Sequence, residues 1–128
     1  MRIEEYFLTL EQLINNLTGT VSFDITKDKR SEHTGFFKVQ IQFRDGKVLH
    51  VREFIQIKKS AVTRMMYAYH LQDSGGNLIF RYDNTMHHPD IPTFPHHKHR
   101  PLIVETSEAP ELETVLKEVQ MLLDFSRN

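Results

Sequence analysis

Two stretches of the chain place apolar residues at helical spacing. Near the start, apolar side chains recur every three or four residues at Ile3, Tyr6, Phe7, Leu10, Leu13, Ile14 and Leu17. Near the end, the same spacing holds for Leu112, Val115, Leu116, Val119, Leu122 and Leu123. Gly19 provides a stop signal after the first stretch, and Pro110 fits the first turn of the second. The pattern predicts one amphipathic helix near each end.

Between these stretches the apolar residues alternate with polar ones, which predicts half-buried strands. The alternation is clear at Val21, Phe23, Ile25, Phe37, Val39, Ile41 and Phe43. Asp45-Gly46 indicates a hairpin, and a three-residue loop that pairs Phe43 with Leu49 and Ile41 with Val51 would keep apolar faces together. Gly46 or Lys47 would then adopt a positive φ. A β-bulge is expected near Glu53-Phe54, where the alternation loses its phase.

A second hairpin is predicted between a strand over 61–71 and a strand over 78–83. Pairing Leu71 with Leu78 would put Tyr69 opposite Phe80 and Tyr67 opposite Tyr82, as an aromatic ladder under the helices. The other face of the sheet would be polar and open to solvent, with candidates Lys38, Gln40, Gln42, Arg44, His50, Arg52, Arg64, His70 and Arg81. The expected fold class is therefore α+β, with about five antiparallel strands and both helices on one face.

Composition narrows the classes of protein that fit. The 128 residues suit a single domain spanning 1–128, and the absence of cysteine excludes a disulfide scaffold or a thiolate zinc site. No apolar run approaches the roughly 20 residues of a membrane span, and the first residues lack an apolar signal region, so we expect a cytoplasmic protein without membrane contact. The net charge of -1 argues against electrostatic binding of nucleic acid by the whole surface. It is compatible with a local basic groove.

The strongest chemical signal is a stretch rich in histidine and proline. Five of the eight histidines lie between His87 and His99, and four prolines fall within residues 84–101. Proline disfavours helix and central strand, so we expect a stiff loop over 84–101. The loop follows directly on the strand that ends near Asp83, which places its histidines at the rim of the open polar face. His33 and His50 are interpreted as surface or structural residues.

Three functions fit these histidines, and the first is acid–base catalysis. Histidine titrates near neutral pH, so a pair of histidines beside basic residues can deprotonate a 2′-hydroxyl and protonate a leaving oxygen. This chemistry is that of a metal-independent ribonuclease acting on RNA. The candidate catalytic residues are His70, Arg81, His97, Lys98 and His99. The candidate substrate-binding residues are Arg64, Asp83, Asn84, His96 and Arg100.

The second function is a metal site, either in a metal-binding protein or in a metal-dependent hydrolase. His97 and His99 point to one side of an extended segment, and His87, His88 or Asp90 offers a third ligand for zinc, nickel or iron. The candidate metal ligands are His87, His97 and His99, with a divalent transition metal as cofactor. The third function is a binding module without chemistry, in which the histidine loop is the contact surface.

Several strings of the sequence resemble one known family. They are Tyr67-Ala-Tyr-His70, Phe80-Arg-Tyr-Asp-Asn84, His87-His88 and Thr93-Phe-Pro-His-His-Lys-His99, followed by a leucine-rich helix. In these the chain resembles the TumE-like proteins, the toxin halves of prokaryotic toxin–antitoxin pairs. The resemblance implies a cytoplasmic toxin with a cognate antitoxin, itself a DNA-binding protein. It implies no particular reaction and transfers no catalytic residues.

Overall fold

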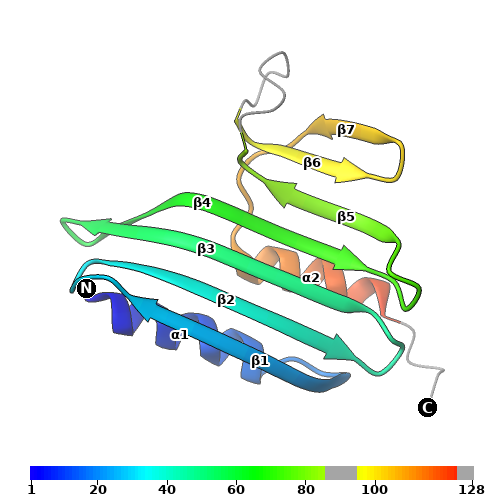
Figure 1. Cartoon of the computed structure of the whole chain (residues 1–128), viewed down its shortest axis with the longest axis horizontal. Helices are drawn as coiled ribbons and strands as arrows, with labels where there is room; N and C mark the ends of the chain where they lie inside the picture. The colour runs from blue at the N-terminus through cyan, green and yellow to red at the C-terminus, as the bar shows by residue number, and fades with distance from the viewer. Residues whose placement is uncertain (86–94, 124–128) are drawn as a thin grey trace.

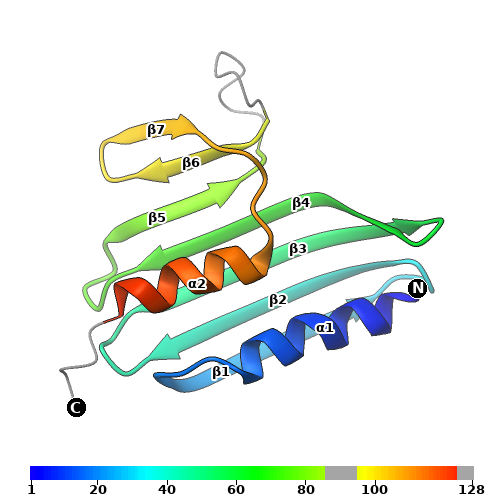
Figure 2. The ribbon, with the colours of Figure 1, turned by 180° about the vertical axis from the view of Figure 1, so that it is seen from behind.

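The computed structural model describes residues 1–85 and 95–123 of the chain. The helices are α1 (Ile3–Asn15) and α2 (Leu112–Leu122). The strands are β1 (Thr20–Lys29), β2 (Thr34–Phe43), β3 (Val48–Lys58), β4 (Ala61–Gln72), β5 (Leu78–Asp83), β6 (His97–Arg100) and β7 (Ile103–Thr106). The seven strands form one antiparallel sheet in chain order, and both helices lie on the same face (Figures 1 and 2).

The α+β class with helices on one face is confirmed, while the sheet has seven strands in place of about five. The two additional strands are β6 and β7, and β6 falls inside the segment that the prolines predicted to be a loop. That prediction is wrong for His97–Arg100 because Pro95 and Pro101 flank these four residues without interrupting them. All four keep the backbone N–H that a strand ladder requires.

The core lies between the helices and the sheet. Helix α1 buries Ile3, Phe7, Leu10 and Ile14, and helix α2 buries Leu112, Val115, Leu116 and Val119. The strands contribute the alternate positions that the sequence pattern assigned to the covered face, among them Phe37, Val39, Ile41, Leu49, Val51, Tyr69, Leu71 and Phe80. Within the described residues, neither helix is long and apolar enough to cross a membrane.

One carboxylate is enclosed in this core. The side chain of Glu53 is fully buried, and its two oxygens accept hydrogen bonds from the hydroxyls of Tyr6 at 2.5 Å and Tyr69 at 2.6 Å. Burial raises the pKa of Glu53, and the two hydroxyl donors offset part of that rise. A buried polar group of this kind is tolerated because each oxygen has a donor.

The first hairpin has the predicted loop length but a different register. Phe43 donates its N–H to the carbonyl of Lys47 at 2.9 Å, which closes a three-residue loop in which Gly46 has φ +93°. Ile41 lies opposite Leu49, so the predicted pair Phe43–Leu49 is wrong by two residues. The apolar faces still coincide, because a shift of two residues preserves the side on which each side chain points.

The second hairpin is shifted in the same way. Tyr69 lies opposite Tyr82, and Leu71 lies opposite Phe80, so the predicted pairs Tyr69–Phe80 and Tyr67–Tyr82 are wrong. The cause is an irregularity after Leu71, where the strand changes register before the turn. The observed register brings Ala68 opposite Asp83 and His70 opposite Arg81.

A bulge in β4 moves Arg64 to the helix-covered face. Phe54 pairs with Met66 and Ile55 pairs with Arg64, so Met65 is the extra residue, beside the Glu53-Phe54 position where a bulge was expected. The Arg64 guanidinium donates to the Tyr69 hydroxyl at 2.8 Å and to the carbonyl of Pro110. The prediction that Arg64 lies on the open face is therefore wrong.

Candidate active site

The face of the sheet opposite the helices carries two rows of side chains that run across the strands, and all but Ala68 are polar. The first row, from β2 to β6, consists of Lys38, Arg52, Ala68, Asp83 and His97. The second consists of Gln40, His50, His70, Arg81 and His99. Directly opposed side chains in an antiparallel sheet are neighbours at about 5 Å between Cβ atoms. The register therefore brings His70, Arg81 and His99 together from three different strands.

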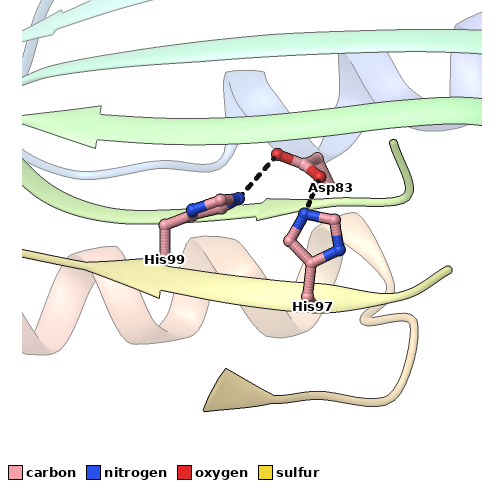
Figure 3. Close-up of side chains that lie close together, drawn as sticks. All are labelled: Asp83, His97 and His99. Atoms are coloured by element: carbon pink, nitrogen blue, oxygen red, sulfur yellow. Dashed lines mark ion pairs between the residues drawn. The ribbon is translucent and has the colours of Figure 1, made fainter. Parts of the chain in front are cut away.

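Asp83 is the centre of this arrangement (Figure 3). Its carboxylate is 3% exposed and accepts hydrogen bonds from Arg81 Nε at 2.8 Å and from the backbone N–H and hydroxyl of Thr85 at 3.2 and 3.0 Å. His97 Nε2 lies 2.6 Å from Oδ1, and His99 Nε2 lies 3.3 Å from Oδ2. Burial raises the pKa of Asp83, but the hydrogen bonds from Arg81 and Thr85 outweigh it and the net pKa is lowered. Asp83 is therefore an ionised carboxylate at neutral pH.

His97 is held inside the protein. Its side chain is 0% exposed, and its second ring nitrogen, Nδ1, lies 2.9 Å from the carbonyl oxygen of Pro95. The two ring nitrogens thus lie beside two different oxygens, one of Asp83 and one of Pro95, and these contacts fix the orientation of the ring. Because the ring does not reach solvent, His97 anchors β6 to Asp83 and cannot itself touch a substrate on the surface.

His99 and Arg81 present their side chains to solvent beside the same carboxylate. The His99 side chain is 25% exposed and its ring lies edge-on to that of His97, with 4.7 Å between centroids. The Arg81 side chain is 34% exposed, and its Nη1 lies 3.5 Å from Nδ1 of His70. Asp83 therefore orients an imidazole and a guanidinium that both reach the open face.

A shallow hollow adjoins Arg81 on the open face. It has a volume of about 240 Å³ and is lined by Lys38, Val39, His50, Val51, Arg52, His70 and Arg81. This volume is below the roughly 300–1,000 Å³ of small-molecule pockets, so the hollow suits one compact group. Within the described residues, neither Lys38 nor Arg52 forms an ion pair with a carboxylate. The uncompensated positive charge favours an anion.

Two histidines line this hollow with their rings at 5.8 Å, edge to face. Burial lowers the pKa of His50 and of His70, and the nearby cations Lys38 and Arg81 lower that of His50 further. Arg81 likewise lowers the pKa of His70. Both rings are therefore neutral at pH 7 and can accept a proton. His50, interpreted from sequence as a surface or structural residue, thus belongs to the site. The cross-strand register would have revealed it.

Three predicted site residues, Lys98, His96 and Arg64, lie on the helix-covered face of the sheet. The prediction that Lys98 acts beside His97 and His99 is therefore wrong. Lys98 forms an ion pair with Glu118 of α2 at 2.8 Å, with its ammonium 4.6 Å from the ring centroid of Tyr82. His96 stacks on Tyr67 and shares a 2.9 Å hydrogen bond with its hydroxyl. Arg64 is the third. The physical reason is that successive side chains of a strand point to opposite faces.

Asn84 and Arg100 lie at the borders of the site. The Asn84 side chain accepts from the N–H of Tyr67 at 3.0 Å and donates to the carbonyl of Met65 at 3.2 Å, so it joins the end of β5 to β4. Arg100 is exposed at the β6–β7 hairpin and pairs with Glu105 at 2.8 Å. Both side chains have roles in holding the strands, and neither lines the hollow.

Within the part of the chain that the structure describes, one group of side chains could hold a metal ion. Asp83, His97 and His99 each offer a ligand atom, and these atoms lie within 4.8 Å of one another. A cation there would compete with the Arg81 guanidinium, which already occupies the same carboxylate at 2.8 Å. His87, proposed from sequence as the third ligand, lies outside the described residues, as do His88 and Asp90.

The comparisons with known proteins agree with the motif resemblance. No curated protein and no solved structure matches the chain. A protein family described as Toxin TumE matches residues 10–127, which include every element of the sheet and the helix α2. A toxin of this kind has a cognate antitoxin. Because the match extends over nearly the whole sequence, the chain belongs to the TumE toxin family.

Proposed function

We propose that this toxin cleaves RNA without a metal ion, using His70 and His99 as the acid–base pair and Arg81 as the phosphate-binding cation. The observation that carries the proposal is the cross-strand row in which Arg81 lies between His70 and His99. Strands are about 4.8 Å apart, so the two histidine backbones stand roughly 10 Å apart. A phosphate held by Arg81 then has one imidazole on each side.

The reaction that suits this geometry is transesterification within the RNA chain. One imidazole accepts the proton of a 2′-hydroxyl as its oxygen bonds to the adjacent phosphorus. The bond from phosphorus to the 5′-oxygen breaks, and the other imidazole, in its protonated form, gives a proton to that oxygen. The products are a 2′,3′-cyclic phosphate and a 5′-hydroxyl. The Arg81 guanidinium stabilises the charge that builds on the phosphate oxygens.

The remaining residues of the site have positioning roles in this proposal. Asp83 orients the imidazole of His99 and the guanidinium of Arg81, and the buried His97 contacts the same carboxylate from the inside. Lys98 has no role in catalysis because it faces helix α2. The toxin acts in the cytoplasm, where RNA is available, and a DNA-binding antitoxin neutralises it.

The test is cleavage of a defined single-stranded RNA by the untagged protein, with and without EDTA. We expect EDTA to leave the rate unchanged, and His99→Ala and His70→Ala each to lower it by about 10²–10⁴-fold, as for loss of a general acid or base. His33→Ala is the matched control, because His33 is exposed at the turn before β2 and far from the row. A 2′-deoxy substitution at the cleaved position should abolish the reaction.

A second candidate is metal-dependent hydrolysis at Asp83, His97 and His99, which their convergence favours. It predicts that EDTA abolishes cleavage and that the protein retains a stoichiometric transition metal after purification. That result would overturn the metal-free proposal. If the wild type cleaves no RNA under either condition, the toxin acts by binding a partner, and the enzyme proposal is wrong.

A further inference from the structure

The open face carries a cluster of apolar side chains that belong neither to the core nor to the row of His70, Arg81 and His99. Phe36, Phe54 and Met66 lie directly opposite one another across β2, β3 and β4, and each is partly exposed. They point to the same side as Arg52, because Arg52 and Phe54 are two residues apart on one strand. We name Phe36, Phe54 and Met66 the aromatic patch, after its two phenylalanine rings.

The aromatic patch is continuous with the basic hollow. The guanidinium of Arg52, which lines the hollow, lies 5.8 Å from the ring centroid of Phe36. Along β3, Phe54, Arg52 and His50 follow one another at every second residue, so the patch and the histidines are about 13 Å apart. One strand thus presents an aromatic ring, a cation and an imidazole in that order.

We propose that the aromatic patch is a subsite for unpaired nucleobases of an RNA strand whose phosphate lies in the hollow, an inference that rests on the proposed function. Nucleobases stack on exposed aromatic rings, while Lys38 and Arg52 neutralise the backbone. The charge of the hollow and the apolar character of the patch together match the two parts of a nucleotide. In a duplex the bases are paired and stacked on each other, so this surface selects single strands.

Binding is separable from cleavage when the RNA carries 2′-O-methyl groups, because the nucleophile is then blocked. The probe is a fluorescein-labelled, unstructured 2′-O-methyl oligonucleotide, titrated by anisotropy as a single strand and as a duplex with its complement. We expect the wild type to bind the single strand at least tenfold more tightly. Phe54→Ala and Phe36→Ala should each weaken single-strand binding about 5- to 100-fold, the effect of losing one base–aromatic stack.

Three further variants control for general loss of apolar surface and for the need for an aromatic ring. Phe23→Ala removes an aromatic side chain that is 42% exposed on the other face of β1, and it should leave binding unchanged. Phe54→Tyr keeps a stacking ring and should bind within about twofold of wild type, whereas Phe54→Leu should bind like Phe54→Ala. Circular dichroism and urea midpoints confirm that each variant is folded.

The outcomes distinguish the two proposals. If Phe54→Ala and Phe36→Ala bind the single strand like wild type, or if wild type binds the duplex equally well, the subsite is wrong even when RNA is cleaved. If single-strand binding depends on Phe54 but the wild type cleaves no RNA, the ribonuclease proposal fails and the subsite stands.

Discussion

Nε2 of His97 lies 2.6 Å from Oδ1 of Asp83, at a point where neither side chain has appreciable contact with solvent. This pair joins β6 to β5 and sets the position of the carboxylate that orients the exposed groups around it. Because the pair is buried, its contribution is mainly structural. His99, on the same strand, is partly exposed and lies 3.3 Å from Oδ2 of the same carboxylate.

Replacing His97 and replacing His99 should therefore change the stability of the protein by different amounts. His97→Ala removes a fully buried ring and one of the contacts of the Asp83 carboxylate, to which Arg81 and Thr85 still donate, and it should lower the free energy of unfolding by on the order of 2–5 kcal/mol, the scale of truncating a large buried side chain. His99→Ala removes a partly exposed ring and should cost about 1 kcal/mol or less. Urea denaturation followed by circular dichroism measures both. Equal losses of stability in the two variants would contradict the assignment of His97 as an anchor.

Lys98 should prove to be structural. Lys98→Gln breaks the ion pair with Glu118 and should reduce stability by about 1–2 kcal/mol while the rate of RNA cleavage per folded molecule stays at the wild-type level. Glu118→Gln should have a similar effect, and the double variant should cost less than the sum of the two. A drop in cleavage of tenfold or more in folded Lys98→Gln would place Lys98 in the chemistry after all.

Stability should fall in mild acid because of three histidines. The pKa values of His50, His70 and His96 lie below the ordinary 6.5, first because burial penalises the charged ring and then because cations lie nearby. Below pH 6.5 the unfolded chain then binds more protons than the folded one, so the free energy of unfolding decreases as pH falls from 6.5 through the lowered pKa values. Well above pH 6.5, where the rings are deprotonated in both states, these groups contribute no slope.

The His50→Gln/His70→Gln variant isolates this effect from other titrating groups such as Glu53, which both proteins share. Urea midpoints between pH 7.5 and 5 should decline less steeply in the variant than in the wild type. A variant with the same slope as the wild type would show that neither ring has a lowered pKa.

The buried Glu53 gives a prediction about the helix-covered face of the sheet. Tyr6→Phe removes one of its two hydroxyl donors and should destabilise the protein by about 1–3 kcal/mol, the scale of leaving a buried polar group without its hydrogen bond. Cleavage by the folded fraction should not change, because this cluster lies under the helices. An unchanged urea midpoint would contradict the role assigned to the Tyr6 hydroxyl, and a lost cleavage activity would link the two faces.

The helices, the strands and the side on which each side chain points could be predicted from periodicity. The residue-to-residue pairing of the strands could not. Alternation fixes the side on which a residue points, and the registers of both hairpins were wrong by two residues, a shift that leaves the faces intact. The single-residue bulge at Met65 changes the face, which is why Arg64 was misplaced. The loss of phase near Glu53-Phe54 indicated a bulge, but it did not indicate that the extra residue lies on the neighbouring strand β4.

The candidate site was found only in part for related reasons. The cluster of histidines drew attention to His97 and His99, and the strand pattern supplied His70 and Arg81. Lys98 was grouped with its sequence neighbours because a loop was expected, whereas a strand separates it from them. Asp83 as the common centre emerged only from the register of β5 with β6.

The strands pair in the order in which they occur along the chain, and this has a consequence for protein synthesis. The cross-strand row is incomplete until β6, late in the sequence, has left the ribosome and paired with β5. A nascent chain that ends before His97 has Arg81 and His70 but lacks His99 and the anchor of Asp83. If the proposed reaction is correct, a nascent chain without β6 lacks the second imidazole and should cleave no RNA.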